Sequence, residues 1–207
     1  VQAFDAQGAE IDRQTIDIWR DDSSVESVSG AITVNTTWSA ANGPFQITSN
    51  LVITNGATLT IQPGTTVYCD PVVYLTVAPG GQLLAEGTPT APIRFTRAPG
   101  TTNYWGNLSV NGTARIAYAR FEYNGATCLR VPRGTVFFDH LTFGNNAFPY
   151  LYLSQASFVV QDCVFPDAAS PFELVYGHYG IKSGGRGIFL RNYFGATTGY
   201  NDVIDFN

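Results

Sequence analysis

Charged residues, and lysine above all, are scarce in this sequence. Only 13% of the chain is charged, about half the usual share, and Lys182 is the one lysine. The formal net charge of −5 argues against a nucleic-acid partner, because phosphate binding needs an excess of Lys and Arg. Neutral polar side chains must then keep the chain soluble, which is typical of a secreted, extracellular or cell-surface protein built from strands.

Methionine is absent and cysteine and histidine are rare. Without Met, we expect Val1 to be a mature N-terminus or a cut inside a longer protein. The odd number of cysteines cannot pair fully within the chain, and their spacing matches no zinc site, so we expect buried thiols. No apolar run is long enough for a membrane span. Neither His140 nor His178 has a G-x-S-x-G partner, which argues against a Ser-His-Asp triad.

Helical spacing of apolar residues is also hard to find. Val, Ile, Thr, Phe and Tyr dominate short runs that Gly, Asn and Pro interrupt, and this pattern predicts an all-β chain. The hydrophobic share of 44% is enough for a sizeable core.

The first 30 residues differ in style from the rest. Residues 1–20 alternate apolar and polar side chains on both sides of a polar turn at 5–8, which predicts a β-hairpin. The polar segment 20–30 is typical of a linker. The hairpin is either an N-terminal cap on the rest of the chain or the tail of a preceding immunoglobulin-like domain, with a short helix over 11–19 as a further alternative.

From residue 31 to 207 a repeat dominates the sequence. When "LVITNGATLTI" is shifted by 24 residues, Leu51 falls on Leu75, Gly56 on Gly80 and Leu59 on Leu83. A period of this length is typical of a solenoid, in which each coil needs its neighbours to bury its apolar side chains. We expect stacked coils about 4.8 Å apart. A β-sandwich is the main alternative, but it does not explain the shared phase.

Weaker copies of the unit come later in the chain, at intervals of about 20 to 30 residues. "YARFEY" aligns Tyr118 with Phe138 of "FDHLTF", and then with Val160 of "VQDCVF" and Leu190 of "LRNYFG". The longer last interval predicts an outward loop at "SPFELVYGHYG", residues 170–180. We expect Phe121, Phe138 and Phe143 to stack inside the solenoid.

These units resemble the opening coils of right-handed parallel β-helices of the pectin-lyase-like superfamily, as found in large secreted bacterial proteins. Three phrases carry the resemblance: "GATLTIQPGTTV" at 56–67, "LLAEGTPTAPIRFT" at 83–96 and "WGNL" at 105–108. The likeness is strong over 31–125 and loose to 207. It implies the fold, and little about function, because the fold carries lyases, hydrolases, adhesins and plain spacers.

The resemblance implies two kinds of catalytic site. Lyases of this fold hold Ca²⁺ with carboxylates beside an Arg or Lys base, and the hydrolases use clustered Asp residues. In this chain "NDVIDF" offers Asp202 and Asp205 as calcium ligands or as acid and base. The Gly-rich stretch before it adds His178, Lys182 and Arg186 as catalytic candidates. The alternative is that both Asp residues close turns and that the Gly-rich stretch is an ordinary loop.

A polysaccharide-binding surface is the other candidate site. Asp139-His140 and Gln161-Asp162 recur at equivalent places in consecutive units and predict an outward polar ladder, which is either structural or the edge of a shallow groove. Exposed aromatic rings can stack on sugars, and the candidates for this role are Tyr104, Trp105, Tyr150 and Tyr152.

The C-terminal phrase "DVIDFN" is strand-like and has no polar cap after it. An open coil invites edge pairing, so we expect another polypeptide to continue the β-helix there. The sequence thus favours a structural or carbohydrate-binding module with no obligatory cofactor. A β-helix polysaccharide lyase or glycosidase, with its site near 178–205 and calcium as its metal, is the alternative. Convergence of Asp202 and Asp205 with Asp139 or Asp162 would favour the enzyme.

Overall fold

The computed structural model describes residues 2–13, 24–125, 127–147, 149–168, 173–198 and 202–206, and the regular elements there are all β-strands. β1 (Gln2–Phe4) and β2 (Glu10–Arg13) form the expected antiparallel hairpin. Its turn is closed by Asp5 Oδ1, which accepts hydrogen bonds from the backbone N–H of Gln7 and Ala9. The continuation expected through Ile16 and Ile18 lies outside the described residues. The hairpin is a separate two-stranded sheet, so no described strand pairing supports its role as a cap.

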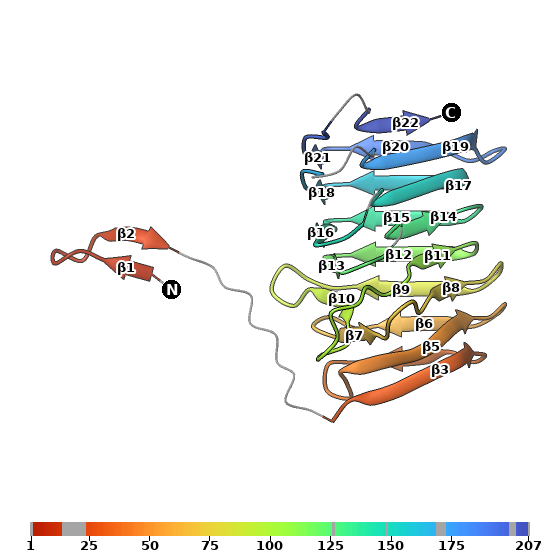
Figure 1. The fold of residues 1–207 in the computed structure, drawn as a ribbon, viewed down its shortest axis with the longest axis horizontal. Helices are drawn as coiled ribbons and strands as arrows, with labels where there is room; N and C mark the ends of the chain where they lie inside the picture. Colours follow the sequence, from red (N-terminus) through yellow and green to blue (C-terminus); the bar gives the residue numbers. More distant parts are fainter. Residues whose placement is uncertain are drawn as a thin grey trace.

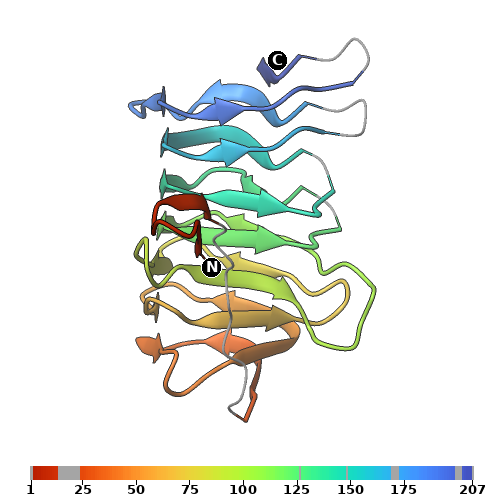
Figure 2. The ribbon, with the colours of Figure 1, turned by 90° about the vertical axis from the view of Figure 1, so that its left-hand side faces the viewer.

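From residue 26 the chain winds into a parallel β-helix, whose coils stack along one axis with β22 at the far end (Figures 1 and 2). Each coil visits three faces in the same order, which we call faces 1, 2 and 3. Three strands bend from one face to the next: β3 (Glu26–Ile32), β5 (Phe45–Ile53) and β17 (Leu151–Gln161).

The remaining strands belong to single faces. Face 1 contains β8 (Leu75–Val77), β11 (Leu108–Val110), β14 (Leu129–Val131), β19 (Val175–Ile181) and β22 (Ile204–Phe206). Face 2 contains β4 (Thr36–Trp38), β6 (Thr58–Ile61), β9 (Gln82–Glu86), β12 (Thr113–Ala117), β15 (Thr135–Asp139) and β20 (Gly187–Leu190). Face 3 contains β7 (Thr66–Cys69), β10 (Ile93–Arg97), β13 (Ala119–Glu122), β16 (Thr142–Gly144), β18 (Val164–Phe165) and β21 (Tyr193–Phe194).

The register predicted from the repeat at 51–85 is confirmed. Leu51 pairs with Leu75 and Leu59 with Leu83, each in a parallel ladder. Gly56 and Gly80 both occupy the left-handed region at the corner between faces 1 and 2, and the Gly56 N–H donates a hydrogen bond to the Gly80 carbonyl. All pairing within the solenoid is parallel, which excludes the sandwich.

Two of the later alignments are wrong. Phe138 pairs with Ile116 and not with Tyr118, so that interval is two residues longer than predicted. A slip of two residues keeps the alternation of inward and outward side chains, so the pattern alone does not reveal it. Val160 pairs with Phe189 and not with Leu190. That slip of one residue matters, because Phe189 packs against the core whereas Leu190 is exposed.

The core is a set of apolar columns inside the coils. As expected, Phe121, Phe138 and Phe143 are buried, and Phe121 stacks on Phe95 with ring centroids 4.7 Å apart and planes 2° apart. The three cysteines are free and buried, as predicted. Burial of such columns, at about 25 cal/mol per Å² of apolar surface, is what a single coil cannot achieve alone.

The predicted loop at 170–180 is wrong. Residues 175–181 form β19, which pairs with β17, and the register shifts only after Ser154. The added residues instead widen the corner between β19 and β20, where the Gly185 N–H donates a hydrogen bond to the Lys182 carbonyl at 2.7 Å. The strand persists because Val175 and Gly177 continue the inward-facing columns.

Candidate functional site

Face 1 contains an open groove of about 450 Å³, which we call the face-1 groove. A column of outward-facing residues forms its floor, because Arg130 pairs with Tyr152 and Tyr152 with Tyr176 on successive strands. The residues that line the groove are Tyr74, Asn107, Thr127, Arg130, Pro149, Tyr152, Glu173 and Tyr176. It therefore combines aromatic rings with amide, hydroxyl, cationic and anionic groups.

The rings on this floor are held by one another. The centroids of Tyr152 and Tyr176 lie 5.7 Å apart with planes inclined by 30°. The Arg130 guanidinium carbon lies 5.3 Å from the Tyr152 ring centroid, which is a cation–π distance. Strand periodicity accounts for the arrangement, since the neighbours Leu151 and Leu153 point into the core and leave Tyr152 outward.

Of the four predicted sugar-stacking residues, only Tyr152 lines this groove. Trp105 and Tyr150 are 1% and 3% exposed, so neither ring face can meet a ligand. The Trp105 indole N–H donates a hydrogen bond to the Glu122 carbonyl at 2.7 Å, and burial raises the pKa of Tyr150 to about 12. Tyr104 is 46% exposed and lies outside the groove lining. Sequence reasoning missed Tyr176 and Arg130, which a correct coil register would have found.

A second group of side chains follows the corner between faces 2 and 3, and we call it the corner row: Tyr118, His140, Asp162 and Arg191. The four occupy equivalent positions in successive coils, each just after a face-2 strand, and all four have left-handed backbone. Such a backbone turns the chain sharply and projects the side chain outward. The predicted equivalence of Asp139 with Gln161 is confirmed.

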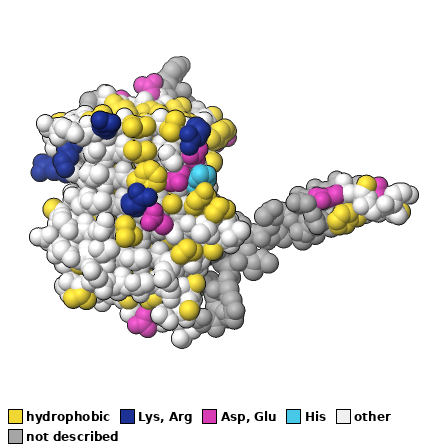
Figure 3. Space-filling view, turned by 180° about the vertical axis from the view of Figure 1, so that it is seen from behind, with side chains coloured by type: hydrophobic (Ala, Val, Ile, Leu, Met, Phe, Trp, Pro, Cys, Tyr) yellow, Lys and Arg dark blue, Asp and Glu magenta, His cyan; other side chains and the backbone are white. Residues whose placement is uncertain are grey.

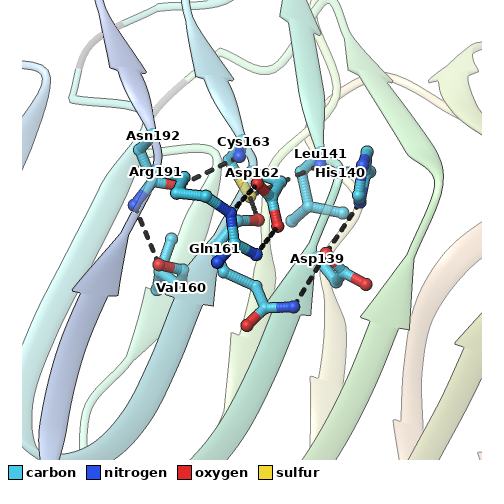
Figure 4. A network of polar contacts seen from close by, with 9 residues as sticks. All are labelled: Asp139, His140, Leu141, Val160, Gln161, Asp162, Cys163, Arg191 and Asn192. Carbon is cyan, nitrogen blue, oxygen red and sulfur yellow. Dashed lines mark hydrogen bonds and ion pairs between the residues drawn. The ribbon is translucent and has the colours of Figure 1, made fainter.

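Contacts run along this row from ring to ion pair (Figure 4). The Tyr118 and His140 rings stack with centroids 4.4 Å apart. Asp139 Oδ1 lies 2.7 Å from His140 Nδ1 and 3.3 Å from Gln161 Nε2. Arg191 donates to both oxygens of Asp162, and these hydrogen bonds hold the pKa of Asp162 below its usual value. The row borders a pocket of about 310 Å³, which Pro89, Pro92 and Arg120 also line.

Within the described ranges, Asp139, His140 and Asp162 are the one group of three such ligands that lie close together, with their atoms within 4.8 Å of one another. The set does not fit calcium, which takes six to eight oxygens. One of the three ligands is an imidazole, and both Asp162 oxygens already accept hydrogen bonds from a guanidinium. No catalytic step through calcium follows from these residues.

Asp202 and Asp205 are not brought to the corner row. Asp205 lies in β22, where it pairs with Tyr176 at the end of the face-1 column, and Asp202 precedes that strand as an exposed residue. Neither belongs to a described group of three His, Cys, Asp or Glu ligands. The convergence that would favour an enzyme at 202–205 is therefore not found, and the carboxylates that do come together are Asp139 and Asp162.

The remaining catalytic candidates are separated. His178 follows Tyr176 in β19, and its ring packs edge-on against Tyr179 with centroids 3.8 Å apart. Its Nδ1 atom is buried and has no hydrogen-bond partner. Lys182 and Arg186 lie beyond it in the widened corner between faces 1 and 2. The three residues do not share one pocket among those that the described residues form.

The order of the faces, the parallel ladders and the corner glycines agree with the comparison with known families. Residues 30–135, about half of the chain, match the pectate-lyase-like beta helix domain. The chain belongs to the pectate-lyase-like β-helix family. No curated protein and no solved structure matches the chain significantly. In the described part of this family member, no helix is long and apolar enough to cross a membrane.

Proposed function

We propose that this β-helix domain is an extracellular module that binds polysaccharide along the face-1 groove. The observation that carries the proposal is the pair of outward tyrosines, Tyr152 and Tyr176, held side by side on a rigid ladder and flanked by Arg130. Flat rings offer apolar faces to the apolar faces of sugars, and the polar groups of the groove offer hydrogen bonds to hydroxyls. The scarcity of charge and the excess of neutral polar residues suit the same setting.

A rigid scaffold also supports a structural role for the module. Every coil pairs its backbone with the coil above and below, so the groove is preformed and ligand binding orders few side chains. Tyrosine adds to this, because it has only two side-chain torsions to fix. We therefore expect modest affinity for each sugar unit and stronger binding to longer chains.

The test is a panel of neutral and acidic polysaccharides, measured by affinity electrophoresis and then by titration calorimetry on those that bind. Tyr152→Ala and Tyr176→Ala should each weaken binding at least about tenfold, which corresponds to ~1.4 kcal/mol. The matched control is Tyr193→Ala, because Tyr193 is an exposed tyrosine on face 3. Equal loss in the control, or unchanged binding in both groove variants, would reject the groove as the binding site.

A glycosidase is the second candidate function, and the corner row favours it. Retaining glycosidases place two carboxyl groups about 5 Å apart, and the Asp139 and Asp162 oxygens approach within 4.8 Å beside a pocket. Asp162, kept ionised by Arg191, would act as the nucleophile, with Asp139 as acid and base. Asp139→Asn and Asp162→Asn should then abolish the release of reducing ends while binding persists. If wild-type protein releases no reducing or unsaturated ends from any bound polysaccharide, this candidate fails.

We also propose that another polypeptide stacks on the last described coil. Phe206 occupies an inward-facing position and yet is 46% exposed, and Leu190 and Ile188 of the neighbouring β20 are exposed as well. Apolar side chains next to an unpaired strand edge favour the addition of another coil. Light scattering coupled to size exclusion tests this proposal. Phe206→Asp should reduce self-association or capture of the partner, and a stable monomer at high concentration would count against the proposal.

A further inference from the structure

The corner between faces 1 and 2 contains a small basic depression, which we call the basic corner. Its volume is about 300 Å³, and it is lined by Arg133, Gln155, Ile181, Lys182 and Ser183. The polar side chains are exposed. No carboxylate belongs to this lining, although the chain as a whole is acidic.

Three successive coils build this depression. Arg133 lies in the turn between β14 and β15, and Gln155 lies at the bend of β17 with left-handed backbone. Lys182 follows β19, and its N–H donates a hydrogen bond to the Ala156 carbonyl at 3.1 Å. The backbone of all three segments is therefore fixed by the ladder, and their side chains meet at one place on the surface.

The cations here differ from the others in the described solenoid, each of which has a partner. Arg94 and Arg120 pair with Glu122, Arg115 with Glu86 and Arg191 with Asp162. Arg97 and Arg130 lie over the rings of Tyr123 and Tyr152.

By contrast, no ion pair or ring contact to the described residues engages Arg133, Lys182 or Arg186. Arg186 follows Lys182 closely and lines the adjoining depression on face 2. Figure 3 shows basic side chains gathered at one edge of this side of the molecule.

We propose that the basic corner binds a tetrahedral oxyanion, the sulfate or phosphate ester of a glycan. A carboxylate has two oxygens, which one guanidinium can satisfy. The corner offers a guanidinium, an ammonium, a hydroxyl and an amide from three segments, which suits an ester group with three free oxygens. The inference rests on the proposed function, because it names the substituent that the bound polysaccharide carries.

The position of the corner fits a ligand that also occupies the face-1 groove. Arg133 lies three residues beyond Arg130 along β14, about 10 Å at the rise of a strand, and Gln155 stands in the same relation to Tyr152. A sugar chain stacked on the tyrosines and following the strand direction would bring an ester group to the basic corner. The groove would supply stacking and the corner would supply charge.

Heparin and its fully desulfated, N-acetylated form are a matched pair of probes, because both keep the carboxylates. Wild-type protein should bind heparin, lose most of the affinity as salt is raised, and bind the desulfated form at least about tenfold more weakly. A phosphorylated mannan, compared with plain mannan, tests the phosphate ester. Arg133→Gln with Lys182→Gln should remove the preference for the esterified form. Arg115→Gln with Arg191→Gln changes the net charge equally and should not.

Lys182 gives a second readout, since it is the one lysine in the chain. Heparin should protect Lys182 from acetylation by an N-hydroxysuccinimide ester, as mapped by mass spectrometry, and the desulfated form should not. Equal binding of both forms, unprotected Lys182, or equal loss in the charge-matched control would overturn the inference. If Tyr152→Ala abolishes binding of every glycan and the basic-corner variant changes nothing, the proposed function stands and the inference fails. If only the basic-corner variant changes binding, the groove fails instead.

Discussion

Arg191 donates two hydrogen bonds to Asp162 across two successive coils, from Nε to Oδ1 at 2.7 Å and from Nη2 to Oδ2 at 2.6 Å. The two residues occupy equivalent left-handed corner positions, so the ion pair follows the coil repeat directly. It fixes the orientation of the carboxylate beside the pocket of the corner row, where the second candidate function places its nucleophile.

Replacing Arg191 by Gln should raise the pKa of Asp162 toward its ordinary value of about 3.9, because the hydrogen bonds from Arg191 are the main cause of the lowered value. Since the folded pKa is lowered, the pair stabilises the fold above the ordinary pKa, and this contribution disappears as pH falls through the lowered one. Carboxyl titration by NMR measures the shift. Arg115→Gln should leave the Asp162 titration unchanged, and an unshifted Asp162 in Arg191→Gln would contradict the prediction.

Glu122 should matter more for stability, because its carboxylate is buried. Burial raises the pKa of Glu122, but the hydrogen bonds from Arg94 and Arg120 outweigh it and the net shift is downward. Glu122→Gln should destabilise the protein by about 1–3 kcal/mol in urea unfolding. Since the folded pKa is lowered, the difference from wild type should be full above about pH 4.3 and shrink as pH falls through the lowered value. Glu86→Gln, in an exposed pair, should change stability by less than about 1 kcal/mol.

The aromatic column should be sensitive to truncation. Phe121 is fully buried and stacks between Phe95 and Phe143, so Phe121→Ala should cost about 3–5 kcal/mol. Phe137→Ala is the matched control, because Phe137 faces outward on face 2 beneath Arg115 and should cost about 1 kcal/mol or less. Chemical denaturation measures both variants. A similar loss for the two would mean that interior stacking is not what stabilises the coils.

The fold was predictable because its signal repeats. Leu51 over Leu75, with Gly56 over Gly80, states the coil period, the inward phase and the corner at once. The later coils lack that redundancy. Where corner lengths vary, sliding a strand by two residues preserves its alternation, so Ile116 and Tyr118 were equally good partners for Phe138 by pattern.

The candidate sites were less predictable, because they depend on which coils lie side by side. Tyr152 was found from its residue type, but Tyr176 and Arg130 join it only through the correct register. Trp105 precedes β11 in an irregular segment, where no alternation tells inward from outward. The corner row uses Tyr, His, Asp and Arg in left-handed backbone, a conformation usually taken by Gly or Asn, so the sequence contained no turn signal there.

The three cysteines should be inert in the folded protein. Burial raises the pKa of the Cys163 thiol to about 12 and raises those of Cys69 and Cys128 as well, and only the thiolate reacts. Ellman's reagent at pH 8 should therefore titrate no thiol in the native protein and all three in denaturant. Ser183→Cys, at the exposed basic corner, should react at once and serves as the positive control. Rapid labelling of a native cysteine would show that its coil opens locally.

Gly56 and Gly80 offer a matched comparison at the corner between faces 1 and 2. Both have left-handed backbone, with φ of 82° and 78°. A Cβ at Gly56 would have no heavy atom within 4 Å, whereas at Gly80 it would clash with the Asn55 carboxamide of the preceding coil. Gly56→Ala should therefore cost only the backbone strain of about 1–2 kcal/mol, and Gly80→Ala should cost more.

Asn55→Ala removes the carboxamide and separates these two terms. In that background, Gly80→Ala should cost no more than Gly56→Ala does in wild type, so the Asn55–Gly80 double-mutant cycle should show clear coupling in urea unfolding. Asn55 is exposed and its side chain can move, so the coupling measures how firmly the neighbouring coil holds it. Additive effects would mean that the carboxamide swings away freely, and that each corner is specified by its own glycine and not by contact between coils.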